Sequence, residues 1–95
     1  MIRIMTARKT KGTTITVDGQ VTGEYVGTIE TVVRQASAAG GLVNLFLRDV
    51  CTIDNDGRAL LSRLAAKGVH LSATGVYSSY IVAEISRSAR NRSAA

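Results

Sequence analysis

The sequence predicts a single-domain α/β protein with a mixed, mostly parallel sheet of four to five strands and about three helices. Three observations lead to this fold class. Short β-branched or apolar runs alternate with two long amphipathic stretches, the first two runs are joined by a short polar link, and 95 residues suffice for one domain. Single helices between strands imply right-handed, parallel crossovers, so the expected order is β-β-α-β-α-β-α.

Two short strands open the predicted sheet. Residues 1–5 alternate Ile2 and Ile4 with polar neighbours, and residues 13–17 alternate threonine with Ile15 and Val17. The link between them is basic and turn-like, which favours an antiparallel hairpin.

The first helix is expected to begin at Thr22, a candidate N-cap, with Glu24 where the helix dipole favours negative charge. Gly40 and Gly41 end it. Apolar residues recur at helical spacing between these signals and form a stripe wide enough to lie on a sheet: Tyr25, Val26, Ile29, Val32, Val33 and Ala36.

The second half repeats the strand–helix pattern. Residues 42–47 are almost wholly apolar, which predicts a central strand covered on both faces, and residues 48–53 read as a link. The next helix carries its leucines on one face, together with Gly57, and ends near Lys67 and Gly68. Residues 69–73 predict a fourth strand. Residues 77–86 predict a last helix with inward-facing Tyr77, Tyr80 or Ile81, and Ile85.

Charge and composition exclude several classes of protein. The net charge is +5, yet six of the twelve basic residues lie in the first loop or in residues 87–95, and aromatic residues make up only 4%. We therefore expect a folded domain over residues 1–86, a disordered basic tail over 87–95, and no nucleic-acid binding. No run is apolar enough to enter a membrane, the first residues lack a signal peptide's apolar core, and a single cysteine fits the cytoplasm.

The chain offers little for catalysis or metal binding. His70 is the only histidine and lies within a predicted strand, and Cys51 is expected to be a small buried residue. The segment around Gly57 resembles a calcium loop, but Thr52 and Arg63 would then occupy the positions that require carboxylates. We expect no catalytic residue, no metal and no cofactor.

The polar segment before the second helix is the most informative part of the chain. It consists of Asp54, Asn55, Asp56 and Gly57, followed by Arg58. Helix capping explains the residue types, because short polar side chains accept hydrogen bonds from first-turn amides. It does not explain Gly57 on the buried face, which suggests a close approach of the helix start to the sheet.

From Thr13 to Ile85 the chain resembles the STAS domain, the fold of anti-sigma factor antagonists, which also occurs at the end of sulfate transporters. Several short features in the right order carry this resemblance. They are Gly19-Gln20-Val21, Val43-Asn44-Leu45-Phe46-Leu47, Asp49-Val50, Thr52-Ile53-Asp54-Asn55-Asp56-Gly57 before an apolar helix, and Lys67-Gly68 before a strand. In the family the fourth feature typically reads apolar-Asp-Ser-Ser/Ala-Gly.

The resemblance implies a protein-interaction function. In the antagonists a kinase-type anti-sigma factor phosphorylates the second serine of that motif, and the unphosphorylated form binds the anti-sigma factor. Here Asp56 occupies the position of that serine, so the usual phosphorylation switch is not expected. The resemblance then implies either a locked partner that resembles the phosphorylated state or a branch of the family that uses the same face differently. The implied partner, an anti-sigma factor, kinase-like or other signalling protein, would bind at the start of the second helix and the neighbouring loop. That surface comprises Thr22, Gly23, Glu24, Asp54, Asn55, Asp56, Gly57 and Arg58.

Other functions stay open at this point. Some STAS domains are small cytoplasmic subunits of lipid-transport assemblies. A small-ligand or nucleotide-binding module, or a hydrolase using Asp54 and Asp56, would need a formed pocket beside these residues. A homodimer that buries the first strand's exposed edge is a further possibility.

Overall fold

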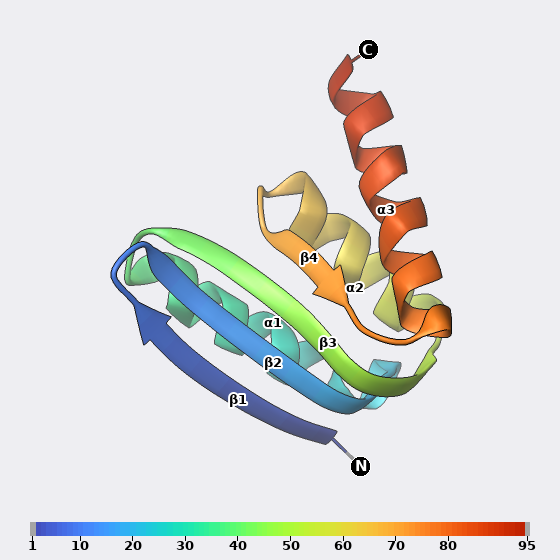
Figure 1. Ribbon diagram of the computed structural model, residues 1–95, viewed down its shortest axis with the longest axis horizontal. Helices are drawn as coiled ribbons and strands as arrows, with labels where there is room; N and C mark the ends of the chain where they lie inside the picture. Colours follow the sequence, from blue (N-terminus) through green and yellow to red (C-terminus); the bar gives the residue numbers. More distant parts are fainter. Residues whose placement is uncertain (1, 95) are drawn as a thin grey trace.

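The computed structural model describes the backbone of residues 2–94 and the side chains of residues 2–87. The predicted α/β class and order of elements are confirmed. The elements are β1 (Ile2–Lys9), β2 (Gly12–Val21), α1 (Gly23–Ala38), β3 (Leu42–Ile53), α2 (Asn55–Ala66), β4 (His70–Ala73) and α3 (Val76–Ala94) (Figure 1). Met1 and Ala95, which belong to the expected first strand and tail, lie outside the described residues.

The four strands form one sheet in the order β1-β2-β3-β4. β1 pairs with β2 antiparallel along its whole length, whereas β2–β3 and β3–β4 are parallel pairs. The sheet is therefore mixed rather than mostly parallel. The β1–β2 hairpin is longer than predicted. The polar residues expected to form its turn continue the antiparallel pairing up to Lys9 and Gly12.

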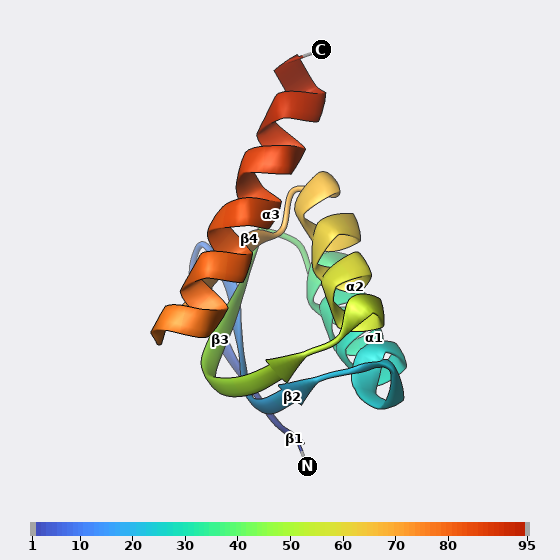
Figure 2. The same ribbon diagram turned by 90° about the vertical axis from the view of Figure 1, so that its right-hand side faces the viewer.

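The core lies on one face of the sheet. The side chains of Ile15, Val17, Leu45 and Leu47 are fully buried there under α1 and α2. Both crossovers step in the same direction across the sheet, so right-handed connections place both helices on the same face (Figures 1 and 2). α3 packs against α2 and along β4.

The opposite face of the sheet carries no covering helix among the described residues (Figure 1). Asn44 and Phe46 alternate with the buried leucines of β3 and are only half-buried. The expectation that residues 42–47 are covered on both faces is therefore wrong. The apolar composition of this strand reflects Phe46 on the half-buried face rather than a second helix layer.

A bulge reshapes the second half of β3. Leu47 pairs with Val17 and Val50 pairs with Gly19, so β3 contributes one more residue than β2 over this interval. The extra length is absorbed at Asp49, whose φ of 53° is left-handed, a conformation that aspartate tolerates better than most residues. Beyond the bulge β3 bends (Figure 2) and continues to Ile53, through residues that were expected to form a link.

β4 is too short to pair with this last part of β3, and side chains of α3 occupy that edge instead. The Ser78 hydroxyl donates to the Val50 carbonyl at 2.9 Å, and Ser78 is buried. The Tyr77 hydroxyl accepts from the Ile53 N–H at 3.0 Å and donates to the Ile53 carbonyl at 3.2 Å. Two side chains thus satisfy backbone groups that a longer β4 would otherwise pair with.

α3 continues as a helix to Ala94, whereas the sequence predicted a disordered segment over residues 87–95. The described side chains that α3 buries end at Ile85. Its final turns project beyond the sheet and α2 (Figures 1 and 2).

We expect Ser78→Ala to lower the free energy of unfolding by about 1 kcal/mol more than Ser79→Ala, because only the first leaves a buried carbonyl without its donor. Ser79 is the matched control, since its hydroxyl donates to the Ala73 carbonyl at 3.2 Å at an exposed position. Urea denaturation of both variants measures the difference. Equal destabilisation would show that the Ser78 bond does not hold the end of β3.

Candidate functional site

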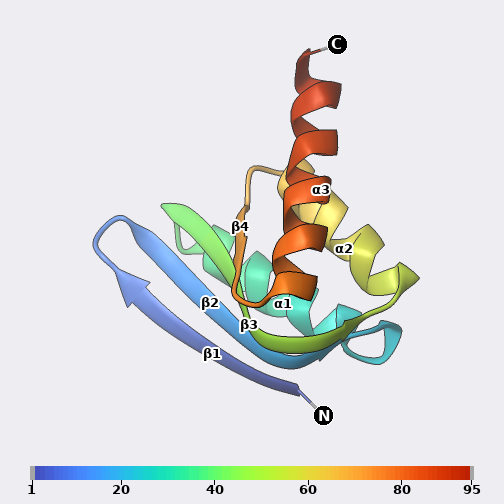
Figure 3. The same cartoon turned by 45° about the vertical axis from the view of Figure 1, so that its right-hand side comes forward.

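One carboxylate joins the starts of α1 and α2. Asp54 is the N-cap of α2, and its Oδ1 accepts the Gly57 N–H at 2.8 Å. Its Oδ2 accepts the N–H of Gly23, the first residue of α1, at 2.9 Å. The β2–α1 and β3–α2 connections therefore lie side by side, as Figures 1 and 3 show. The predicted proximity of the two segments is confirmed.

The same bonds fix the charge of Asp54. The N–H of Gly23, and after it that of Gly57, hold the pKa of Asp54 below its ordinary value, since both stabilise the ionised carboxylate. Both carboxylate oxygens are already engaged by the backbone. Asp54 therefore positions the two helix starts, and its ionised carboxylate stabilises the folded state.

Thr22 occupies the N-cap position of α1 as predicted, but its side chain makes no capping hydrogen bond. Asp54, a residue distant in sequence, supplies the missing acceptor to the first amide of the helix. Glu24 lies exposed in the first turn, as expected. A local sequence pattern identifies the start of α1, but it cannot show that the hydrogen-bond acceptor for its first amide is Asp54, which follows β3.

Gly57 allows α2 to begin directly against β2. A Cβ atom at this position would overlap the carbonyl oxygen of Val21 and lie 2.8 Å from its carbonyl carbon. Gly57 is buried, and the Asp54 N–H donates to the same Val21 carbonyl at 3.2 Å. The predicted close approach of the helix start to the sheet is confirmed, and the obstacle is backbone that cannot rotate away.

Asp56 presents an exposed carboxylate on this surface. It lies in the first turn of α2 and against the start of α1, where a Cβ atom on Gly23 would come within 2.7 Å of its Oδ2. Asp56 is therefore close to the N-termini of two helices, an arrangement that the helix dipoles favour. Asn55 beside it is also exposed.

Arg58 has a partner within the chain. Its guanidinium forms an ion pair with Glu84 of α3, and both side chains are partly exposed. Arg58 thus ties α2 to α3, and it also lines a hollow between the first turns of these two helices. This hollow has a volume of about 500 Å³ and is lined by Ile53, Asp54, Asn55, Arg58, Val76, Tyr77, Tyr80 and Ile81.

The aromatic side of this hollow is the part of the surface that the sequence analysis missed. It placed Tyr77 and either Tyr80 or Ile81 inward; the structure buries Ile81 but leaves both tyrosines exposed. The buried stripe of α3 starts one residue later than predicted and comprises Ser78, Ile81, Val82 and Ile85. Spacing of three and four residues along this set could have identified it, but a serine at its first position concealed the pattern.

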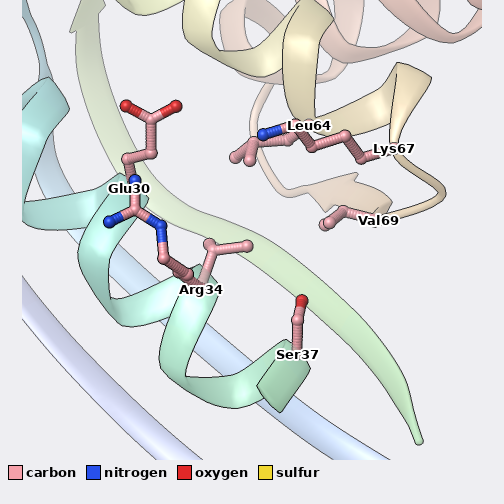
Figure 4. A pocket seen from close by; sticks show the side chains of 7 residues that line it. Glu30, Arg34, Ser37, Leu64, Lys67 and Val69 are labelled. Carbon is pink, nitrogen blue, oxygen red and sulfur yellow. The ribbon is translucent and has the colours of Figure 1, made fainter. Parts of the chain in front are cut away.

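A smaller hollow of about 190 Å³ lies between the later turns of α1 and α2, away from Asp54 (Figure 4). Glu30 and Arg34 stand on its α1 side and Lys67 on its α2 side, over an apolar floor that includes Leu64 (Figure 4). Glu30 also pairs with Arg63 at 3.5 Å. This hollow contains none of the residues predicted to form the site.

The remaining candidate residues lie apart from one another. His70 is exposed on β4, and Cys51 is exposed on β3 with its thiol donating to the Gly19 carbonyl at 3.3 Å, so the expectation of a buried Cys51 is wrong. Among the described residues, no three His, Cys, Asp or Glu side chains are grouped as a metal site. Over the same residues, no helix has the length and apolar character needed to cross a membrane.

Comparison with protein-family models finds no match to this chain, and a search of curated proteins likewise finds none.

We expect Gly57→Ala to lower the free energy of unfolding by about 1–3 kcal/mol, because the new methyl group forces α2 away from Val21. The matched control is Gly27→Ala in α1, where a Cβ atom meets nothing within 4 Å. There the higher helix propensity of alanine should add up to about 1 kcal/mol. Chemical denaturation measures both; a stabilising effect at both positions would contradict the close approach.

We expect Asp54→Asn to lower the melting temperature at neutral pH, because the neutral side chain binds the two amides less well. The lowered pKa of Asp54 makes its contribution complete above the unfolded pKa of about 3.9, and this contribution disappears as pH falls through the folded value. The difference in melting temperature from wild type should therefore shrink below about pH 4.

Thermal unfolding across this pH range tests the Asp54 prediction, with the neighbouring uncharged variant Asn55→Ala as the control. The control should follow the wild-type pH profile. A difference between Asp54→Asn and wild type that stays constant down to pH 2 would contradict the role of the carboxylate charge.

Proposed function

We propose that this protein is a non-catalytic, cytoplasmic STAS-like interaction domain that binds a signalling protein through the starts of α1 and α2. The resemblance to anti-sigma factor antagonists supplies the partner class, an anti-sigma factor or kinase-like regulator. The observation that carries the proposal is the Asp54 bridge, which brings Thr22–Glu24 and the first turn of α2 onto one exposed surface. Interaction surfaces on α/β domains commonly lie at such strand-to-helix connections.

Asp56 gives this surface its chemical character. It stands at the place where the resembled family carries the phosphorylated serine, and it adds one permanent negative charge there. A phosphoserine carries about −1.5 to −2 at neutral pH, so Asp56 carries a smaller charge that phosphorylation cannot change. We propose that partner binding here is constitutive with respect to serine phosphorylation.

The hydrolase alternative is less well supported by the geometry. Paired-carboxylate chemistry needs one group whose pKa is raised so that it can donate a proton. The pKa of Asp54 is lowered instead, by the Gly23 and Gly57 amides that occupy both of its oxygens. Of the two aspartates that this alternative requires, only Asp56 then has a carboxylate without backbone hydrogen bonds among those described.

We expect Asp56→Lys to abolish partner binding and Asp56→Asn to weaken it, because both remove the negative charge. Affinity capture from the source cells, with quantitative mass spectrometry, should identify proteins that wild type retains, that Asp56→Asn retains in smaller amount and that Asp56→Lys loses. The same partner should respond to Asp56→Ser, either through altered retention or through phosphate incorporation when the captured partner is a kinase.

The matched control for these variants is Asp49→Asn. Asp49 is an exposed carboxylate away from the helix starts, and asparagine also tolerates its left-handed backbone. Retention should be unchanged in this control. If Asp49→Asn and Asp56→Lys reduce retention equally, or neither does, the surface at the start of α2 is not the binding site.

A further inference from the structure

Exposed apolar side chains are concentrated at the start of α3. Among the described residues, five large hydrophobic side chains are clearly exposed: Met5, Leu42, Val76, Tyr77 and Tyr80. The last three lie within two turns of one helix, with 91% of Val76 and 67% of Tyr80 exposed. Single exposed apolar residues are ordinary, but a cluster of three beside a hollow is typical of an interaction surface.

One member of this cluster is held in place beside the proposed partner surface. Tyr77 makes two hydrogen bonds to Ile53, and the Arg58–Glu84 ion pair joins α2 to α3. The hollow between α2 and α3, called the groove below, is lined by Asp54 and Asn55 on one side and by Val76 and Tyr80 on the other. A side chain that is already held in place loses little conformational entropy on binding, which favours affinity.

The helix starts beside the groove carry acidic side chains, although the chain as a whole is basic, with seven acidic and twelve basic residues. Asp54 lines the groove, and Asp56 and Glu24 lie in the first turns of α2 and α1 next to it. Arg58 also lines the groove, but its charge is balanced by the ion pair with Glu84. The groove therefore carries aromatic side chains on its α3 side and unbalanced negative charge at the neighbouring helix starts.

We propose that the groove between α2 and α3 binds a segment of the partner protein in which lysine or arginine side chains stand beside apolar ones. This inference rests on the proposed function and names the chemistry of its partner. Carboxylates at the groove attract the cations, the tyrosine faces accept them through cation–π contacts, and Val76 with Tyr80 covers the apolar side chains. Tyrosines on a rigid helix are typical anchor residues of such interfaces.

The test uses two short amphipathic helical peptides as probes, one with lysine beside leucine and one with glutamate replacing each lysine. Each is titrated into the full ¹⁵N-labelled chain at low salt. We expect the lysine peptide to shift backbone amides within residues 54–58 and 76–81, with the glutamate peptide causing no shift. Added salt should weaken the binding, since charge complementarity drives it.

The decisive variant is Tyr80→Ser, with Leu42→Ser as its matched control. Both residues are exposed to a similar degree, 67% and 69%, and Leu42 lies at the far end of β3. We expect Tyr80→Ser to weaken peptide binding at least about tenfold and Leu42→Ser to leave it unchanged. Retained chemical-shift dispersion in both variants would show that they remain folded.

Three outcomes would overturn this inference: no binding of the lysine peptide, shifts confined to the open face of the sheet, or equal effects of the two serine variants. A concentration-dependent dimer that Tyr80→Ser dissociates would identify a second copy of the chain as the occupant and would also overturn it. Failure here is distinguishable from failure of the proposed function. In that case Asp56→Lys would still lose the captured partner, whereas Tyr80→Ser would retain it.

Discussion

The arrangement of the whole candidate surface depends on the Asp54 carboxylate. Its two oxygens accept amide protons from α2 and from α1, so two helices that arise from different strands begin at one point. Gly57 makes this possible, because any side chain there would push α2 off the Val21 carbonyl. The close approach and the shared cap are thus two parts of one constraint. Together they explain why capping residues and a glycine occur in one short segment.

The parts of the fold that depend on local pattern could be predicted from the sequence. Alternation in residues 13–17 and the apolar stripes of the two central helices gave the correct element order. Features that depend on contacts between segments distant in the sequence could not be predicted. The bulge at Asp49 lengthens β3 through residues that look like a loop, and the uncovered sheet face follows from the direction of the crossovers rather than from composition.

In the candidate site, too, the features with a local sequence pattern could be predicted and the others could not. Asp54 and Gly57 were assigned correct structural roles because capping and packing leave local signatures. The aromatic residues at the start of α3 were misplaced, since the buried position nearest to them is Ser78, whose hydroxyl is satisfied by the Val50 carbonyl. A buried serine of this kind is not recognised as apolar, so the sequence pattern predicts Tyr77 as the first inward residue and does not decide between Tyr80 and Ile81, of which the structure buries Ile81.

The repeated direction of the crossovers has a consequence for how such a domain can grow. Each strand–helix unit adds a strand on the same side of the sheet and a helix on the same face, as in repeat proteins in which neighbouring units stack. An array of this kind must be ended at both sides. The antiparallel β1 ends it on one side, and α3, packed along the short β4, ends it on the other. The start of α3 adds to this ending, because Tyr77 and Ser78 occupy the edge of β3 that the short β4 leaves unpaired.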